Sequence, residues 1–342
     1  MAFIVTFGEI MLRLSPPGRE LLFQSPRLKA VFGGGEANVA VSLAIFGHHA
    51  RYVSAVPANE VGDAALRELR KWGVDTGFVI RQGKRLGIYF AETGANQRAS
   101  KVTYDREGSG IAEAKGGDFD WAKALAGAGW FHVTGITPAL SATAADLTLE
   151  AVKAARAAKV TVSVDLNYRA KLWNYGKGAR EVMREVTRHA DLLLGNEDDC
   201  QKALGVDLPG GTKTEAPAVA AYETLTGRVM NEFPNLARVA ITLRESHSAD
   251  HNGWSAVLRN RAKFISGPSY DIRSIVDRIG AGDAFAAGLI HGLTSRLPDE
   301  DALGFAVAAS CLKHSVPGDF NLVTEKDVQA LVEGDRSGRV RR

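Results

Sequence analysis

The chain has 342 residues, of which 45% are hydrophobic and 24% are charged, and its formal net charge is +3. This composition supports a sizeable core and excludes an intrinsically disordered chain, and the nearly balanced charge gives no indication of nucleic-acid binding. With no apolar run near the roughly 18 residues of a membrane span, and with only two cysteines, the sequence predicts a cytoplasmic protein without a disulfide framework.

Strand-like and helix-like segments alternate along most of the chain. Hydrophobic periodicity, β-branched residues and helix-ending glycines predict strands over 3–14, 51–56, 160–166, 191–194 and 238–243, and helices over 36–46, 63–72 and 144–158. This alternation is typical of a mainly parallel sheet covered by helices on both faces, with ligands bound at the carboxyl ends of its strands. The sequence therefore predicts an α/β fold.

Two segments depart from this alternation. The region of about 81–112 contains short strand patterns that suit a hairpin better than a crossover. Together with residues 12–32, it is predicted to form a small β-sheet standing off the main unit. No linker or internal repeat divides the chain, so we expect a single domain over 1–342 with this small sheet as a lid.

The most informative segment is 276–289, where Gly280-Ala281-Gly282-Asp283 opens an amphipathic helix. The small residues allow backbone N–H groups to approach an anion, and the N-terminal end of a helix adds partial positive charge. Asp283 in the first turn is then placed to accept a proton from an attacking hydroxyl. This combination meets the needs of phosphoryl transfer. A purely structural glycine-rich helix start, with Asp283 as a helix-end carboxylate, would have the same sequence pattern.

Two other phosphate-binding motifs are absent. The chain has no G-x-x-x-x-G-K-[ST] sequence, which excludes a P-loop enzyme. Gly33-Gly34-Gly35 lacks the G-x-G-x-x-G spacing of a dinucleotide site.

The segment around Asp283 resembles the signature of the phosphofructokinase-B family of carbohydrate kinases, also called the ribokinase family. A second family motif, Gly33-Gly34-Gly35-Glu36-Ala37-Asn38-Val39-Ala40, lies about 245 residues earlier in the expected order. The resemblance implies a ribokinase-like three-layer α/β/α sandwich with a mainly parallel sheet and a small β-sheet lid over the sugar.

The resemblance also implies roles for the residues of the first motif. Asp283 would act as the catalytic base, and the amides of Gly280, Ala281 and Gly282 would bind the transferring phosphate. Asp277 would help to organise a monovalent-cation site, with K⁺ as the expected ion, although it could equally serve as a turn cap. Mg-ATP is the expected phosphoryl donor.

Sugar-binding residues follow from the same resemblance. Gly34 and Asn38 match positions that approach sugar hydroxyls, and Arg169 follows a strand in the pattern D-x-N-x-R, where it suits a carboxylate or phosphate. In the predicted lid, Tyr89, Tyr104 and Arg106 resemble sugar-contacting positions of 2-keto-3-deoxygluconate kinases. Each also has a plain structural alternative: a helix cap for Asn38, a surface arginine for Arg169, and packing for the tyrosines.

The nucleotide site is less regular. Most relatives carry Thr-x-Gly where this chain has Thr242-Leu243-Arg244-Glu245, so we expect a differently built adenosine pocket. An N-x-x-D sequence, Asn196 to Asp199, stands where the family has N-x-x-E, and Asp199 is expected to orient magnesium-bound water unless it only caps a helix. The expected nucleotide-binding residues are Asn196, Thr242, Arg244, Gly282 and Asn321.

The expected reaction is ATP-dependent phosphorylation of 2-keto-3-deoxygluconate, a small acidic sugar, to its 6-phosphate. Fructokinase, or another sugar or nucleoside kinase of the same fold, is the alternative. A sugar-binding regulator without catalysis belongs to a different class, and the intact Gly280-Ala281-Gly282-Asp283 motif argues against it. By family analogy, a homo-oligomer is expected, with subunits paired through the lid sheet.

Overall fold

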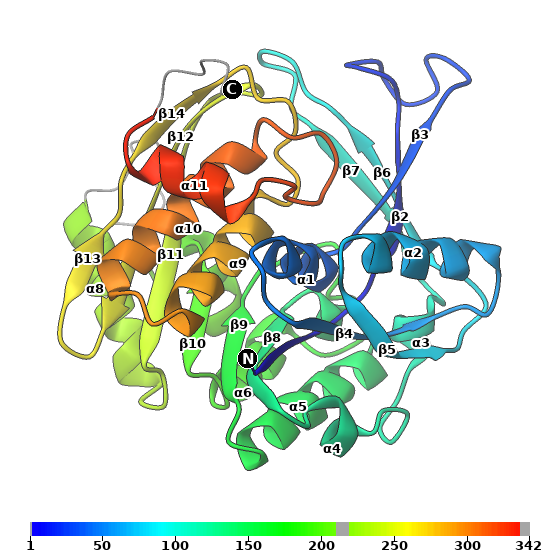
Figure 1. The fold of residues 1–342 in the computed structure, drawn as a ribbon, viewed down its shortest axis with the longest axis horizontal. Helices are drawn as coiled ribbons and strands as arrows, with labels where there is room; N and C mark the ends of the chain where they lie inside the picture. Colours follow the sequence, from blue (N-terminus) through cyan, green and yellow to red (C-terminus); the bar gives the residue numbers. More distant parts are fainter. Residues whose placement is uncertain (1, 210–218, 336–342) are drawn as a thin grey trace.

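The computed structural model describes residues 2–209 and 219–335, and its elements form two sheets and the helices around them (Figure 1). The larger sheet contains, in spatial order, β13 (Phe264–Ser266), β12 (His251–Asn260), β11 (Arg238–Ser248), β10 (Leu192–Gly195), β9 (Thr161–Asp165), β8 (Ala128–Thr134), β1 (Phe3–Phe7), β4 (Ala50–Val56) and β5 (Asp75–Arg81), and β14 (Tyr270–Arg273) pairs with β12.

The strands from β11 through β5 run parallel, and β12, β13 and β14 add antiparallel pairings beyond β11. A parallel pair needs a crossover, and helices occupy most of the crossovers here. The predicted α/β fold with a mainly parallel sheet is therefore confirmed.

Helices cover both faces of this sheet (Figure 1). Successive strand residues point to opposite faces, so Leu192 and Leu194 of β10 join one hydrophobic cluster while Leu193 joins the other. The first cluster includes residues of α1 (Gly35–Ile45), α2 (Glu60–Lys71), α9 (Ala281–Thr294), α10 (Asp299–Lys313) and α11 (Glu325–Val332). The second includes residues of α3 (Gly110–Glu113), α4 (Trp121–Ala124), α5 (Ala142–Ala157), α6 (Ala179–Thr187), η2 (Cys200–Leu204) and α8 (Val219–Glu232). Two short helices, η1 (Thr137–Ala139) and α7 (Glu197–Asp199), follow β8 and β10.

The smaller sheet has the order β3 (Lys29–Gly33), β2 (Met11–Ser15), β6 (Gly87–Glu92) and β7 (Lys101–Asp105), and it projects beside the main body (Figure 1). β6 and β7 form the predicted antiparallel hairpin. β2 pairs with β3 on one side and runs parallel to β6 on the other, which brings the two predicted segments together.

The prediction of one continuous strand over residues 3–14 is wrong. β1 ends at Phe7 in the larger sheet, and β2 begins at Met11 in the smaller one. The chain turns at Gly8, where a Cβ would lie 2.0 Å from Oε2 of Glu36 and where the carbonyl accepts hydrogen bonds from Tyr52 and Ser54. Only a glycine leaves room for this carboxylate, and the resulting break joins the two sheets.

The strand predicted over 238–243 is longer than expected. β11 continues to Ser248 and pairs antiparallel with β12, so that Thr242 faces Ala256 and Arg244 faces Trp254. The segment that departs from the family's Thr-x-Gly pattern is therefore part of a strand. Among the helices of the described residues, none has the length and apolar character needed to cross a membrane.

Candidate active site

A cavity of about 490 Å³ lies between the smaller sheet and the carboxyl ends of the central parallel strands. Met11, Tyr89, Val102 and Tyr104 line it from the smaller sheet, and Asp165, Gly195 and Thr242 from strands of the larger one. Gly282, Asp283 and Phe285 of α9 also line it. This position agrees with the rule that α/β proteins bind ligands beyond the carboxyl ends of their strands.

The Gly280 turn begins α9 on the cavity wall. Gly280 has φ = 85°, and a Cβ there would lie 2.1 Å from the carbonyl oxygen of Asp319, so both the conformation and the close approach require glycine. A Cβ on Gly282 would meet nothing within 4 Å, so the wall is open there. Ala281 is buried outside the lining, and its N–H donates to the carbonyl of Arg278 at 3.3 Å. Of the three predicted residues, Gly280 and Gly282 therefore face the cavity.

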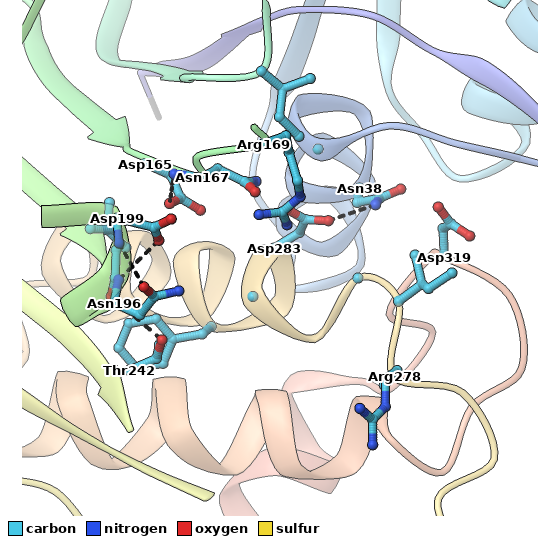
Figure 2. A pocket seen from close by; sticks show the side chains of 18 of the residues that line it. Asn38, Asp165, Asn167, Arg169, Asn196, Asp199, Thr242, Arg278, Asp283 and Asp319 are labelled. Carbon is cyan, nitrogen blue, oxygen red and sulfur yellow. Dashed lines mark hydrogen bonds between the residues drawn. The ribbon is translucent and has the colours of Figure 1, made fainter. Parts of the chain in front are cut away.

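Asp283 lies in the first turn of α9, and Asn38 of α1 holds it in place (Figure 2). Nδ2 of Asn38 donates to Oδ2 of Asp283 at 2.7 Å, and Oδ1 of Asn38 accepts the N–H of Gly34 at 3.2 Å. Burial raises the pKa of Asp283 to about 7, and this hydrogen bond from Asn38 opposes the rise. A carboxylate with a pKa near neutrality is well matched to general-base work.

Arg169 lines the cavity, and its side chain reaches toward Asp283 (Figure 2). It follows β9 on an exposed loop, where Nη1 donates to the carbonyl of Tyr168 at 2.8 Å. Its positive charge lowers the pKa of Asp283, against the larger effect of burial. The guanidinium is therefore available to an anionic group of a ligand.

The two predicted lid tyrosines also line the cavity. Tyr89 on β6 and Tyr104 on β7 are paired in the hairpin, with ring centroids 6.3 Å apart. The hydroxyl of Tyr89 donates a short hydrogen bond to Asp319, a buried cavity residue that also accepts from Arg13 at 2.9 Å. The hydroxyl of Tyr89 therefore already has a hydrogen-bond partner within the protein.

Arg106, by contrast, is not brought into the cavity lining. It is buried, and its Nε donates to Oε2 of Glu9 at 2.6 Å, while its guanidinium lies over the ring of Tyr104. Glu9 follows β1 in the break between the two sheets, a position that the sequence pattern treated as strand. The ion pair with Glu9 fixes Nε of Arg106, and this side chain is not among the residues that line the cavity.

The predicted nucleotide residues separate into two groups. Asn196, Thr242 and Arg244 line the cavity together with Arg278. Arg244 lies over the ring of Trp254, with 5.2 Å between its Cζ and the ring centroid. Asn321 is buried outside the lining, and no hydrogen-bond partner of its side chain occurs in the described residues.

Asp199 and Asp165 are two buried carboxylates on the same side of the cavity as Asn196 and Thr242 (Figure 2). Asp199 and Asn196 make a reciprocal capping box at the start of α7, so the helix-cap alternative for Asp199 is present. Burial raises the pKa of Asp199 to about 6, and burial together with the charge of Asp199 raises the pKa of Asp165 to about 8. Two neighbouring buried carboxylates suit Mg²⁺, which binds one or two such groups plus phosphate oxygens and water.

These two carboxylates do not make a complete metal cage. Within residues 2–209 and 219–335, no group of three or more His, Cys, Asp or Glu side chains is arranged to hold a metal ion. Two carboxylates are a number that Mg²⁺ uses when phosphate oxygens and water supply its other ligands.

Asp277, the expected monovalent-cation ligand, makes several contacts within the protein. Its Oδ1 accepts the N–H of Ile279 at 3.1 Å, and its Oδ2 accepts the N–H of Gly318 at 3.1 Å. Arg13 of β2 also places Nη1 2.8 Å from the same Oδ2. Both oxygens of Asp277 thus accept backbone N–H groups, as expected for the turn-cap alternative.

Four further residues of this region were not predicted as site residues: Glu9, Asp165, Asp319 and Arg278. Asp165 begins the same D-x-N-x-R pattern that singled out Arg169, so a local signal for it existed. Asp319 and Glu9 instead have partners more than 90 positions away in the sequence.

Comparisons with known proteins agree with this geometry. The model of the pfkB family of carbohydrate kinases matches residues 1–233 and 252–326. The crystal structure of 2-dehydro-3-deoxygluconokinase from Thermotoga maritima is 45% identical, with a TM-score of 0.93 over 98% of this chain and 100% of that one. The 2-dehydro-3-deoxygalactonokinase of Haloferax volcanii is 32% identical over 98% of each chain.

A fructokinase from Xylella fastidiosa, solved with bound ATP, has a TM-score of 0.78 at 21% identity, covering 97% of this chain and 98% of that one. At this identity the likeness concerns the fold, and it extends the ribokinase-like architecture to a more distant kinase. The match of the family model over most of the sequence, with the cavity and the Gly280 turn in their expected places, shows that the chain belongs to the pfkB family of carbohydrate kinases.

Proposed function

We propose that this kinase transfers the γ-phosphoryl group of ATP to the 6-hydroxyl of 2-keto-3-deoxygluconate. The observation that carries the proposal is Asp283, a buried carboxylate with a pKa of about 7 at the start of α9, in a cavity that also presents Arg169. The similarity to the Thermotoga maritima enzyme supports the same substrate.

In the proposed step, Asp283 accepts the proton of the sugar's 6-hydroxyl as its oxygen attacks the γ-phosphorus. The bond between the γ-phosphorus and the bridging oxygen of ATP breaks, so the products are ADP and the 6-phosphate ester. The N-terminal end of α9, with Gly280 and Gly282 on the cavity wall, stabilises the charge of the transferring group. The base and the anion site are thus adjacent on one helix.

The sugar is proposed to lie between α1 and the smaller sheet. Arg169 binds its carboxylate through a charge-assisted hydrogen bond, and Asn38 and Tyr104 offer polar groups to its hydroxyl and keto oxygens. Residues of β2, β6 and β7 line the same cavity, which supports the proposed lid role of the smaller sheet.

The triphosphate is proposed to lie along the part of the cavity lined by Arg244, Arg278 and Asn196, because guanidinium groups suit phosphate oxygens. Asp165 and Asp199 are the residues that would hold the magnesium of Mg-ATP. The bound magnesium ion would neutralise part of the negative charge of the phosphates.

A coupled ADP-release assay tests this function. With Mg-ATP at saturation, kcat/KM for 2-keto-3-deoxygluconate should exceed that for fructose, ribose and adenosine by at least about tenfold, the effect expected of one charged hydrogen bond. 2-Keto-3-deoxygalactonate belongs in the same series, since the Haloferax volcanii relative is a 2-dehydro-3-deoxygalactonokinase. A preparation of Asp283→Asn serves as the control for contaminating kinases.

The outcomes of this assay separate the hypotheses. A preference for fructose would contradict the acidic substrate while leaving the kinase reaction intact. Absence of ADP release with every sugar would favour the non-catalytic regulator instead.

The pH dependence of kcat/KM follows from the pKa of Asp283. Only the ionised carboxylate can accept a proton, and a raised pKa of about 7 keeps the group protonated below that pH. Activity should therefore reach a plateau above pH 7 and fall about tenfold per pH unit below it. Asn38→Ala removes the hydrogen bond that lowers this pKa, so its midpoint should move to higher pH. A midpoint that stays in place in that variant would contradict the assignment of this titration to Asp283.

A further inference from the structure

Lys313, the last residue of α10, is a fully buried lysine beside the Gly280 turn. Its relative exposure is 0%, and its Nζ donates to the carbonyl of Val316 at 3.0 Å. Its Cε lies 3.3 Å from the position that a Cβ on Gly280 would occupy. The side chain therefore packs against the turn that we assign to phosphate binding, although burying an ammonium group costs considerable free energy unless it is compensated.

Nearby charges provide this compensation. Arg13, Asp277 and Asp319 are buried in the same region, and Arg13 forms ion pairs with both carboxylates. Burial lowers the pKa of Lys313, but the negative charges of Asp277, Asp319 and Asp283 oppose this lowering, while Arg13 adds to it. The two cations, Arg13 and Lys313, thus balance the charge of Asp277 and Asp319. Asp283 is the third carboxylate of this region.

Nζ of Lys313 donates to a backbone carbonyl, a type of oxygen that also binds potassium. Potassium and ammonium carry the same charge, are similar in size, and are both bound by backbone carbonyl oxygens such as that of Val316. Asp277, the residue expected to organise a potassium site, already accepts from Arg13 and two backbone N–H groups. The region therefore already contains the charge that a bound monovalent cation would bring.

We propose that the ammonium group of Lys313 takes the place of a bound monovalent cation beside the Gly280 turn, so that this kinase requires no potassium. The inference rests on the proposed kinase reaction, and it reverses the expectation of a potassium site at Asp277. Lys313 acts here as a positioning residue, since it supports the turn and does not line the cavity.

The wild-type enzyme provides the first test. Turnover is measured with Mg-ATP and 2-keto-3-deoxygluconate in tetramethylammonium chloride, and then with potassium, sodium or ammonium chloride at the same ionic strength. Because screening is constant across this series, we expect turnover to change by less than about twofold. The thermal unfolding midpoint should be equally insensitive to the cation.

Two variants then separate charge from packing. Lys313→Ala leaves space for an ion, and its turnover should fall by about tenfold or more in tetramethylammonium and recover partly in potassium. Potassium should also raise its thermal midpoint. Lys313→Met fills the space without charge, so it should be slow in every salt. Lys326→Ala, on the exposed face of α11, is the matched control and should behave like the wild type.

Several results would overturn the inference. The proposal is wrong if potassium activates the wild type severalfold. It is also wrong if a folded Lys313→Ala enzyme keeps full turnover, or if potassium changes neither its turnover nor its thermal midpoint. Should neither variant fold, the two wild-type series decide the question by themselves. If no sugar is phosphorylated at all, the proposed reaction fails, whereas the thermal midpoints still decide whether the protein binds potassium.

Discussion

Replacing Asp283 with asparagine is expected to lower turnover by about 10²–10⁴-fold while sugar binding survives. Asparagine has nearly the same shape and can keep the contact with Asn38, but it cannot take up a proton. The loss should therefore appear in kcat, with little change in the binding of the keto acid measured by calorimetry.

Stability distinguishes this catalytic effect from misfolding. Because the folded-state pKa of Asp283 is raised to about 7, the carboxylate favours folding when protonated at low pH, and this contribution is lost as the pH rises through 7. At pH 8 the uncharged asparagine should leave the protein at least as heat-stable as the wild type. Asp301→Asn, which removes an exposed carboxylate from α10, is the matched control. Near-normal turnover of Asp283→Asn would refute the assigned base.

The second large effect is expected for Arg169→Ala, which should lower kcat/KM for 2-keto-3-deoxygluconate by about 10- to 100-fold more than for fructose. This range corresponds to the loss of a hydrogen bond to a charged group. Arg169 also lowers the pKa of Asp283, but that effect applies to both acceptors. The ratio of the two kcat/KM values therefore isolates the contact with the carboxylate.

Three further variants sharpen this test. Arg169→Lys retains the charge without the planar fork and should give an intermediate ratio. Arg67→Ala, on the exposed side of α2, should leave the ratio unchanged. Arg106→Ala would leave Glu9 buried without its ion-pair partner, so its main effect should be on stability. If Arg106→Ala loses the preference for the keto acid and Arg169→Ala keeps it, the substrate carboxylate binds Arg106 and the assignment to Arg169 is wrong.

The parts of the site that sequence reasoning located best are those made by neighbouring residues. Gly280 to Asp283 are consecutive, so the turn, the start of α9 and the carboxylate in its first turn follow from local rules about glycine and helix ends. Arg169 was found in the same way, because a residue just beyond a parallel strand lies at the ligand-binding edge of the sheet.

The parts that sequence reasoning missed depend on distant partners. Glu9 holds Arg106 across 97 sequence positions, and Asp319 holds Tyr89 across 230. A charged residue predicts that some partner exists but does not identify it, and a strand pattern cannot show that Gly8 ends β1 and turns the chain into another sheet. For this reason the pairing of Arg106 with Glu9 was not predicted, and Arg106 was expected at the sugar.

The sequence by itself determined the alternating α/β architecture, the family, and a carboxylate beside a helix N-terminus, because periodicity and turn chemistry act over a few residues. Only the tertiary structure decided the balance of charge around that carboxylate. Asn38 reaches Asp283 across 245 positions, and Arg13 reaches Asp319 across 306. Burial and these long-range contacts set the pKa values and leave Lys313 as an internal cation, and both depend on three-dimensional packing that no local pattern encodes.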